Sequence, residues 1–319
     1  MSSAALFTVV LPVFGLIGVG YAVVTLGILK EDVANGLGDF VFVVALPILL
    51  FRSLGTLELP EVSPVPFWLA YFSGAFIVGA VGVLLTEKAF RRDARAGVIG
   101  GICSAYANLL MVGVPVMNQA FGQEGLVLVF ILIAIHLPVM MTVSAFLIEI
   151  AEHRDGAGTG RMRIGEALVR TGRSLIRNAL VIAILAGLAW RTTGLPLEGV
   201  PREIMDRVAE TAIPLALVAL GMSLKKYGIR GNVPPALVLG LMKLFVMPGV
   251  VFLIAKYVVG LPPLAVAVAT LGAACPTGVN AYLVATRFRT GLALSANTIT
   301  LTTAGSVLSV TFWLALLAD

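Results

Sequence analysis

Two apolar stretches of this chain, each long enough to cross a bilayer, are interrupted by residues that break helices. The interruptions read SAYANLLMVGVPVM (104–117) and LGAACPTGVNAYLVA (271–285). Proline removes a backbone donor and clashes with the preceding helical turn. In hydrocarbon the freed polar groups cannot bond to water, so such breaks persist only where protein or an aqueous cavity satisfies them. Paired breaks in two halves of a chain favour the substrate site of a secondary transporter.

The composition predicts an all-α membrane protein. Of the 319 residues, 59% are hydrophobic and only 12% are charged, whereas soluble domains carry about 25% charged residues. The basic residues lie between apolar spans, so membrane topology explains the net charge of +5 without a nucleic-acid partner. Cys103 and Cys275 show no disulfide or metal-ligand pattern. We expect a lipid bilayer as partner and no cofactor, and we leave proton or sodium coupling open.

Ten stretches are apolar over roughly 20 residues, the length that a spanning helix needs. They lie at 4–26, 35–55, 66–87, 97–120, 125–150, 173–193, 203–226, 235–258, 263–285 and 291–317. A basic, Gly-rich loop at 151–172 separates five spans in 1–150 from five in 173–319. Most loop Lys and Arg residues fall on the side of this central loop, which predicts that this side is cytoplasmic. Both termini would then be periplasmic or extracellular, and we expect a bacterial inner membrane.

Five helices in each half predict two repeats of opposite orientation, the inverted repeats of many transporters. The same landmarks recur in both halves. Asp39 stands eight residues before Pro47, and Asp206 stands eight residues before Pro214. The paired helix breaks are a second shared landmark.

Three segments resemble the auxin efflux carrier family, which includes plant auxin exporters and bacterial malonate-type permeases. They are NLLMVGVPV (108–116), CPTGVNAYLVATRF (275–288) and LSANTITLTTAGSVLSVTFW (294–313). The resemblance implies a fold similar to sodium/proton antiporters and bile-acid sodium symporters, in which broken helices 4 and 9 cross. It also implies a scaffold of helices 1, 2, 6 and 7, which would hold a homodimer, and a core of helices 3–5 and 8–10 that moves as an elevator.

The broken helices suit an anion, because each half-helix N-terminus presents unpaired N–H groups and a partial positive charge. Asn108 and Asn280 add side-chain amides beside the breaks, although they could instead satisfy backbone groups that the prolines free. We therefore expect a small mono- or dicarboxylate to bind here. The predicted binding residues are Asn108, Gly113, Pro115, Pro276, Thr277, Gly278, Asn280 and Lys243.

Lys243 lies about eight residues inside the eighth span, roughly 12 Å along a helix. A charge at such depth favours a functional role over a snorkelling side chain. Lys243 would serve either as a counter-charge for the substrate or as a fixed cation where related folds hold sodium. The second role would argue against sodium coupling.

Other polar residues in the spans are weaker candidates. His136 lies in the fifth span, where it would carry protons or, as we favour, bond a neighbouring helix in its neutral form. Thr298, Thr302 and Ser306 share one face of the tenth span, which suits a cavity wall and interhelical hydrogen bonding equally well. A membrane enzyme is disfavoured, because no nucleophile or metal constellation is evident. A sodium-coupled anion symporter is the alternative, although neither break carries a carboxylate.

Overall fold

The computed structural model describes residues 3–56, 62–156, 172, 177–229, 231 and 233–317. All regular elements in these ranges are helices, and an isolated bridge between Ala107 and Thr277 is the only strand-like pairing among them. Within the described ranges, seven helices are long and apolar enough to cross a membrane: Thr8–Thr25, Asp32–Thr56, Pro64–Ala89, Leu109–Arg154, Gly199–Tyr227, Pro234–Val258 and Leu292–Leu317. Shorter apolar helices are Ala94–Ala105, Ala179–Thr192 and Pro263–Ala274. The chain is therefore an all-α membrane protein, as its composition predicts.

Both predicted helix breaks are present. At the first break, one helix ends at Ala105 and the next begins at Leu109. At the second break, one helix ends at Ala274 and the next begins at Asn280. Most of the central loop predicted at 151–172, and the start of the span predicted at 173–193, lie outside the described residues.

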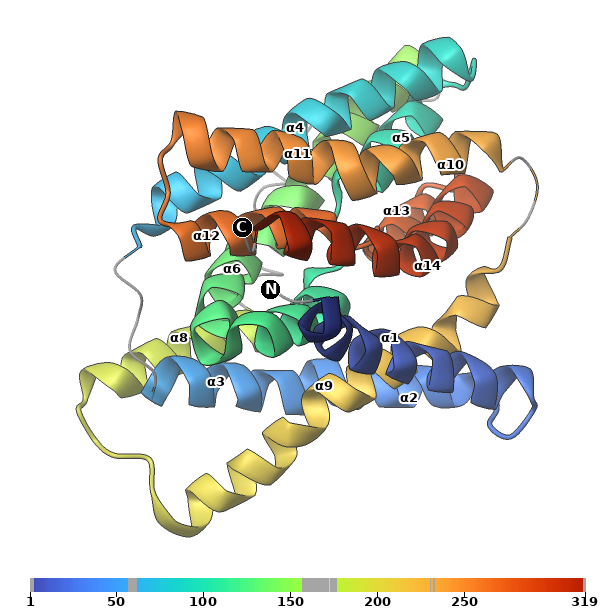
Figure 1. Ribbon diagram of the computed structural model, residues 1–319. Coiled ribbons are helices and arrows are strands. Elements are labelled where there is room, and N and C mark those ends of the chain that lie inside the picture. The colour runs from blue at the N-terminus through green and yellow to red at the C-terminus, as the bar shows by residue number, and fades with distance from the viewer. Residues whose placement is uncertain are drawn as a thin grey trace.

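One group of helices, the lower group, occupies the lower part of Figure 1. It comprises α1 (Ser3–Thr25), α2 (Asp32–Phe40), α3 (Leu46–Thr56), α8 (Ala179–Thr192) and α9 (Gly199–Tyr227). A π-helical turn, Val41–Ala45, joins α2 to α3. Within this group α1 packs along α9, and α3 packs against both α8 and α9.

The remaining helices form the upper group. It comprises α4 (Pro64–Leu84), α5 (Ala94–Ala105), α6 (Val114–Arg154), α10 (Pro234–Leu241), α11 (Met247–Leu253), α12 (Pro263–Ala274), α13 (Asn280–Arg287) and α14 (Leu292–Leu317). The π-helical turns of this group are Leu85–Ala89, Leu109–Gly113, Met242–Val246 and Ile254–Val258. Here α4 packs on α5 and α11, and α12 packs on α11 and α14. Helix α6 bends at Gly122, whose φ of 57° suits glycine.

Small residues allow α1 and α9 to approach each other closely, as is usual between membrane helices. A Cβ added at Gly221 would collide with the Ile17 carbonyl oxygen, and one added at Gly20 would collide with the Val218 carbonyl oxygen. These obstacles are backbone atoms, so they cannot rotate away. The packing of the lower group therefore depends on the two glycines.

We expect Gly221→Ala to destabilise the protein by about 1–3 kcal/mol, because the added methyl group forces the two backbones apart. The measurement is the thermal unfolding midpoint in detergent. Gly15→Ala, on α1, is the matched control, because a Cβ there meets no atom within 4 Å. Equal midpoints for the two variants would contradict the account of this packing.

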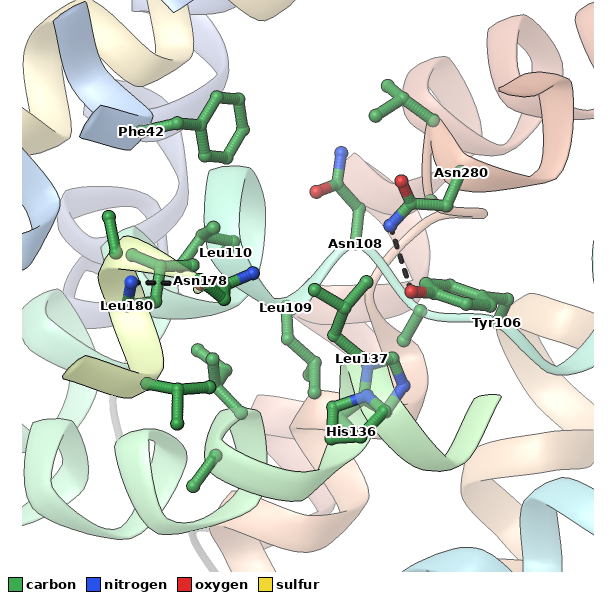
Figure 2. A pocket seen from close by; sticks show the side chains of 18 of the residues that line it. Phe42, Tyr106, Asn108, Leu109, Leu110, His136, Leu137, Asn178, Leu180 and Asn280 are labelled. Carbon is green, nitrogen blue, oxygen red and sulfur yellow. Dashed lines mark hydrogen bonds between the residues drawn. The ribbon is translucent and has the colours of Figure 1, made fainter. Parts of the chain in front are cut away.

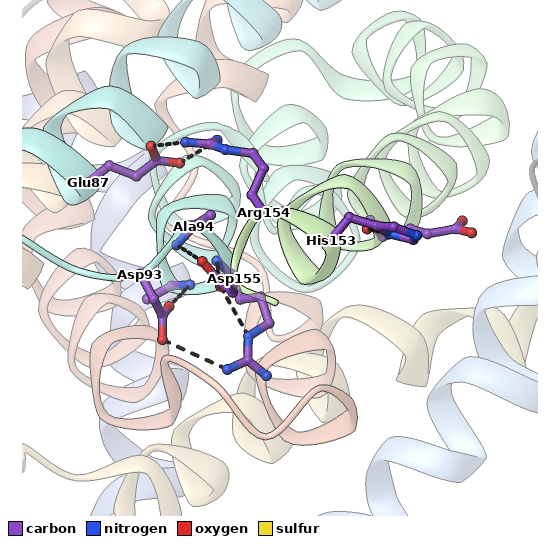
Figure 3. A network of polar contacts seen from close by, with 9 residues as sticks. Glu87, Asp93, Ala94, His153, Arg154 and Asp155 are labelled. Atoms are coloured by element: carbon purple, nitrogen blue, oxygen red, sulfur yellow. Dashed lines mark hydrogen bonds and ion pairs between the residues drawn. The ribbon is translucent and has the colours of Figure 1, made fainter. Parts of the chain in front are cut away.

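An ionic network joins the ends of α5 and α6 with the turn that follows α4 (Figure 3). Asp155 accepts hydrogen bonds from the Ala94 and Arg95 N–H groups at 2.9 and 3.0 Å, and Arg154 binds Glu87 through two N–H groups at 3.0 and 2.8 Å. Partial burial acts to raise the pKa of the Asp155 carboxyl. The N–H groups of Ala94 and Arg95 and the Arg95 guanidinium outweigh that effect and hold the pKa below its usual value of 3.8.

Asp155→Ala should lower the free energy of unfolding by about 1–3 kcal/mol at neutral pH, because two N–H groups at the start of α5 lose a charged acceptor. The lowered pKa places this contribution above pH 3.8, and it is lost as the pH falls through the pKa of the folded state. The measurement is denaturant unfolding of both proteins at neutral pH. Glu203→Ala is the control, because the exposed Glu203–Arg207 pair should contribute almost nothing. A loss no larger than that of the control would rule out a stabilising network.

Candidate binding site at the helix breaks

The two helix breaks pair with each other. The Asn108 N–H donates to the Pro276 carbonyl oxygen, and the Gly278 N–H donates to the Tyr106 carbonyl oxygen, both at 2.8 Å. These two bonds flank the antiparallel bridge between Ala107 and Thr277. Each break thus satisfies backbone groups of the other, as unwound backbone at membrane depth requires.

Side chains satisfy further backbone groups on the buried side of this pairing. The Thr277 hydroxyl donates to the Cys103 carbonyl oxygen at 2.6 Å, which serves the C-terminal end of α5. The Thr277 N–H donates to the Thr302 hydroxyl oxygen on α14 at 3.0 Å. Thr277 and Thr302 are fully buried and lie outside the cavity described next. They hold the break in place.

A cavity of about 420 Å³ lies beside the paired breaks, between the upper and lower groups. Figure 2 shows Asn108, Asn280 and Tyr106 at one end and Asn178 and Leu180 at the other. The upper group contributes residues of both breaks and of α6, and the lower group contributes Phe42, Val43 and the first two turns of α8. The sequence-predicted residues that line it are Asn108, Gly278, Asn280 and His136.

Asn108, one of the residues that line this cavity, carries an unsatisfied side-chain donor. Its Oδ1 accepts a hydrogen bond from the Met111 N–H at 3.2 Å, which caps the helix that follows and fixes the orientation of the amide. Its Nδ2 is buried and has no partner. A buried donor left unpaired costs about 1–3 kcal/mol, so an acceptor in the cavity that reached Nδ2 after a small movement of the lining would recover that energy.

Both half-helix N-termini reach the cavity at the same end. Leu109 and Leu110 begin one half-helix, Val279 and Asn280 begin the other, and all four line the cavity. The first N–H groups of a helix lack intrahelical acceptors and carry a partial positive charge. The amide of Asn108 and these two helix ends together form a donor-rich corner.

Asn280 and His136 bond to tyrosines. The Asn280 amide donates to the Tyr106 hydroxyl oxygen at 2.8 Å. The His136 Nε2 lies 3.3 Å from the Tyr71 hydroxyl on α4, and its ring meets Tyr106 edge-on with centroids 5.0 Å apart. The bond to α4 is the arrangement expected of a neutral histidine that joins two helices.

The remaining predicted residues lie behind the breaks, away from the cavity lining. Gly113 faces the Cys275 sulfur, and Pro115 is buried in the first turn of α6. The hydroxyls of Thr298 and Ser306 bond within α14, to the carbonyl oxygens of Leu294 and Thr303. Lys243 is buried against the end of α12.

Tyr106, Phe42 and Asn178 are among the cavity residues that were not predicted from the sequence. Tyr106 supports Asn280, Phe42 supplies an apolar wall, and Asn178 caps α8 by accepting from the Leu180 N–H at 2.9 Å. An aromatic residue inside a helix break was the available signal for Tyr106. No pattern in the sequence indicated that Phe42 and Asn178 face the breaks.

A family model described as "Membrane transport protein" matches residues 5–314. The chain belongs to the auxin efflux carrier family. The predicted resemblance is confirmed, and the protein is a multi-pass membrane transporter. The family is one of transporters, so the expectation that the chain is not an enzyme is also confirmed.

Full-length relatives occur in bacteria and archaea. A Rhizobium meliloti protein named "Putative malonate transporter" is 24% identical over 95% of this chain and 92% of that protein. An "Uncharacterized transporter" of Methanothermobacter thermautotrophicus is 28% identical over 95% of this chain and 96% of that protein. The "Lysosomal cholesterol signaling protein" of Mus musculus is 25% identical over 60% of this chain, which corresponds to 22% of that longer protein.

Proposed function

We propose that the protein is a secondary transporter of a small organic anion, a mono- or dicarboxylate, bound where the two breaks meet. The observation that carries this proposal is the buried, unpaired Nδ2 of Asn108, a residue that lines the cavity that two helix N-termini also reach. Amide donors and helix N-termini bind a carboxylate without a dedicated cation.

We further propose that ten helices form two inverted repeats, 1–150 and 173–319, with the fourth and ninth helices crossing at the breaks. The reciprocal bonds from Asn108 to Pro276 and from Gly278 to Tyr106 support this arrangement. A two-fold axis through the bridge between Ala107 and Thr277 would exchange one bond for the other, as inverted repeats require.

In this proposal the lower group is a scaffold, which contains helices 1, 2, 6 and 7 and forms a homodimer. The upper group is the transport core of helices 3–5 and 8–10. The cavity lies between them, with the donor-rich corner on the core and Phe42 on the scaffold. An elevator-type displacement of the core along the scaffold would carry the corner, with its anion, from one membrane face to the other.

We propose a bacterial inner membrane as the location, and the charge pattern of the loops supports an orientation with both termini in the periplasm. Arg95 and Arg154 belong to loops predicted to be cytoplasmic. Their partners Asp155 and Glu87 bring the ends of α5 and α6 together on one face. Figure 3 shows Arg154 bound to Glu87 near Asp155, which binds Ala94 at the start of α5.

The cavity lining favours a monocarboxylate with a short apolar body. None of the described residues that line the cavity is Lys, Arg, Asp or Glu. Apolar residues such as Ile133, Leu137 and Ile184 make up most of its walls. A second carboxylate would lie against apolar walls, and burial of an unpaired charge is costly. The name of the Rhizobium meliloti relative makes malonate the dicarboxylate to compare.

A sodium-coupled symporter remains the alternative function. In transporters with broken helices, coupling sodium ions bind to carbonyl groups of unwound backbone and of half-helix C-termini. Among the described residues no Asp or Glu lines the cavity, so the lining offers sodium no carboxylate. Transport without sodium therefore agrees better with the cavity.

The central test is counterflow uptake into liposomes by purified protein, with labelled carboxylates and with or without sodium and proton gradients. We expect uptake of at least one carboxylate without sodium. Asn108→Asp should reduce it by about tenfold or more, because the variant keeps the acceptor for Met111 but replaces the free donor with a negative charge.

Asn178→Asp is the matched control, because it also keeps a helix cap and adds the same charge, at the opposite end of the cavity. It should retain clearly more uptake than Asn108→Asp. If both variants lose uptake equally, the anion does not bind at Asn108 but elsewhere in the cavity. If the protein takes up no carboxylate at all, the proposed substrate class is wrong.

Competition between unlabelled acids tests the preference for one carboxylate. We expect propionate or butyrate to displace the labelled substrate at concentrations about tenfold or more below those of malonate or succinate at neutral pH, because the second charge lacks a partner. Stronger competition by malonate would contradict this interpretation of the lining.

A further inference from the structure

Lys243 is completely buried behind the helix breaks. Among the described residues it is the only Asp, Glu, Lys or Arg that is buried. It lies in the π-helical turn Met242–Val246 between α10 and α11. Such turns alter the direction of side chains and are frequent at functional sites.

The Lys243 ammonium binds the C-terminal end of half-helix α12. Its Nζ donates to the Ala273 carbonyl oxygen at 2.5 Å and to the Cys275 carbonyl oxygen at 2.6 Å. The Ser309 hydroxyl donates to the intervening Ala274 carbonyl oxygen at 3.2 Å. Carbonyl groups at a helix C-terminus carry a partial negative charge, which a cation complements.

The corresponding end of α5 is satisfied by neutral donors. The Thr277 hydroxyl binds the Cys103 carbonyl oxygen, and the Ser104 hydroxyl binds the Gly101 carbonyl oxygen at 2.9 Å. Among the described residues, a cationic side chain thus binds the C-terminal end of α12 but not that of α5. In transporters with broken helices, such carbonyl groups are where a coupling cation binds.

We propose that the Lys243 ammonium is a tethered cation that fills the carbonyl site at the end of α12, so that anion transport needs no mobile coupling cation. The flux experiment below rests on the proposed transport function, whereas the cation site itself does not. The site itself is tested by cation binding to a variant that lacks the side chain.

The position of Lys243 also explains a preference for anions. Lys243 does not line the cavity, and the break at 275–279 separates its charge from the donor-rich corner. No ion pair joins Lys243 to an Asp or Glu among the described residues. An anion in the cavity would supply negative charge on the other side of the break, and the attraction is screened less because Lys243 is buried in protein.

The first experiment compares thermal unfolding of the wild type and Lys243→Ala, without any carboxylate, in sodium, potassium, ethylammonium or propylammonium chloride. N-methylglucamine chloride is the reference, because that cation is too large for the site. The truncated side chain leaves space beside carbonyl oxygens that a small cation can occupy. At least one small cation should raise the midpoint of Lys243→Ala by about 2–4 °C and leave the wild type unchanged.

Two further variants separate charge from packing. Lys243→Met fills the space without a charge, so it should be destabilised and should not respond to cations. Lys225→Ala removes a partly exposed lysine that contacts the Val24 carbonyl oxygen, so it should show no cation response either. If no small cation stabilises Lys243→Ala more than it stabilises the wild type, the carbonyl groups are not a cation site and the proposal is wrong.

The second experiment measures counterflow in liposomes. Wild-type flux should be the same within about twofold when N-methylglucamine replaces sodium. We expect Lys243→Ala to have low flux in N-methylglucamine, because the carbonyl site is then empty, and its flux should rise with the cation that stabilises it. Sodium-dependent flux of the wild type would overturn the proposal even if Lys243→Ala did not fold. Cation rescue of stability, combined with no carboxylate transport by the wild type, would instead refute the proposed substrate and leave the cation site standing.

Discussion

Backbone hydrogen-bonding groups that leave a helix inside a membrane must find partners in the protein, and this requirement organises the centre of the molecule. The bonds from Asn108 to Pro276 and from Gly278 to Tyr106 make each break the partner of the other. Because neither break is satisfied without the other, α5, α12 and the helices that follow them must meet at one point. The cavity, the helix N-termini that reach it, and the buried side chains of Thr277, Thr302 and Lys243 all lie around that point.

The paired breaks separate two chemically different sides. Helix N-termini and Asn108, whose Nδ2 has no partner, line the cavity side, where an anion finds donors. Helix C-termini lie on the other side, where Lys243 and Thr277 donate to their carbonyl groups. An anion in the cavity and the fixed Lys243 ammonium, on opposite sides of the unwound segment 275–279, would stabilise each other. In our proposal this makes binding selective for anions without a cation in the cavity wall.

The sequence revealed the parts of this arrangement that local chemistry dictates. Proline and glycine in apolar spans predicted both breaks, and the depth of Lys243 marked it as unusual. Local patterns did not reveal directions that depend on how distant helices pack. Lys243 reaches a carbonyl group of α12 because it lies in a π-helical turn, which sets the direction of its side chain. The Thr302 hydroxyl accepts from the Thr277 N–H because of the way α14 is rotated about its own axis. Phe42 reaches the cavity only through packing between the two groups of helices.

The most direct test is a structure of the purified protein with the carboxylate that uptake measurements identify. We predict that one carboxylate oxygen lies within hydrogen-bonding distance of the Asn108 Nδ2, with the apolar body along α6 and α8. The Lys243 ammonium should remain on the α12 carbonyl oxygens without contacting the ligand. Density for the anion at another site, such as the cavity lined by Arg92 and Arg289, would contradict the account. Direct contact between Lys243 and the ligand would contradict it as well.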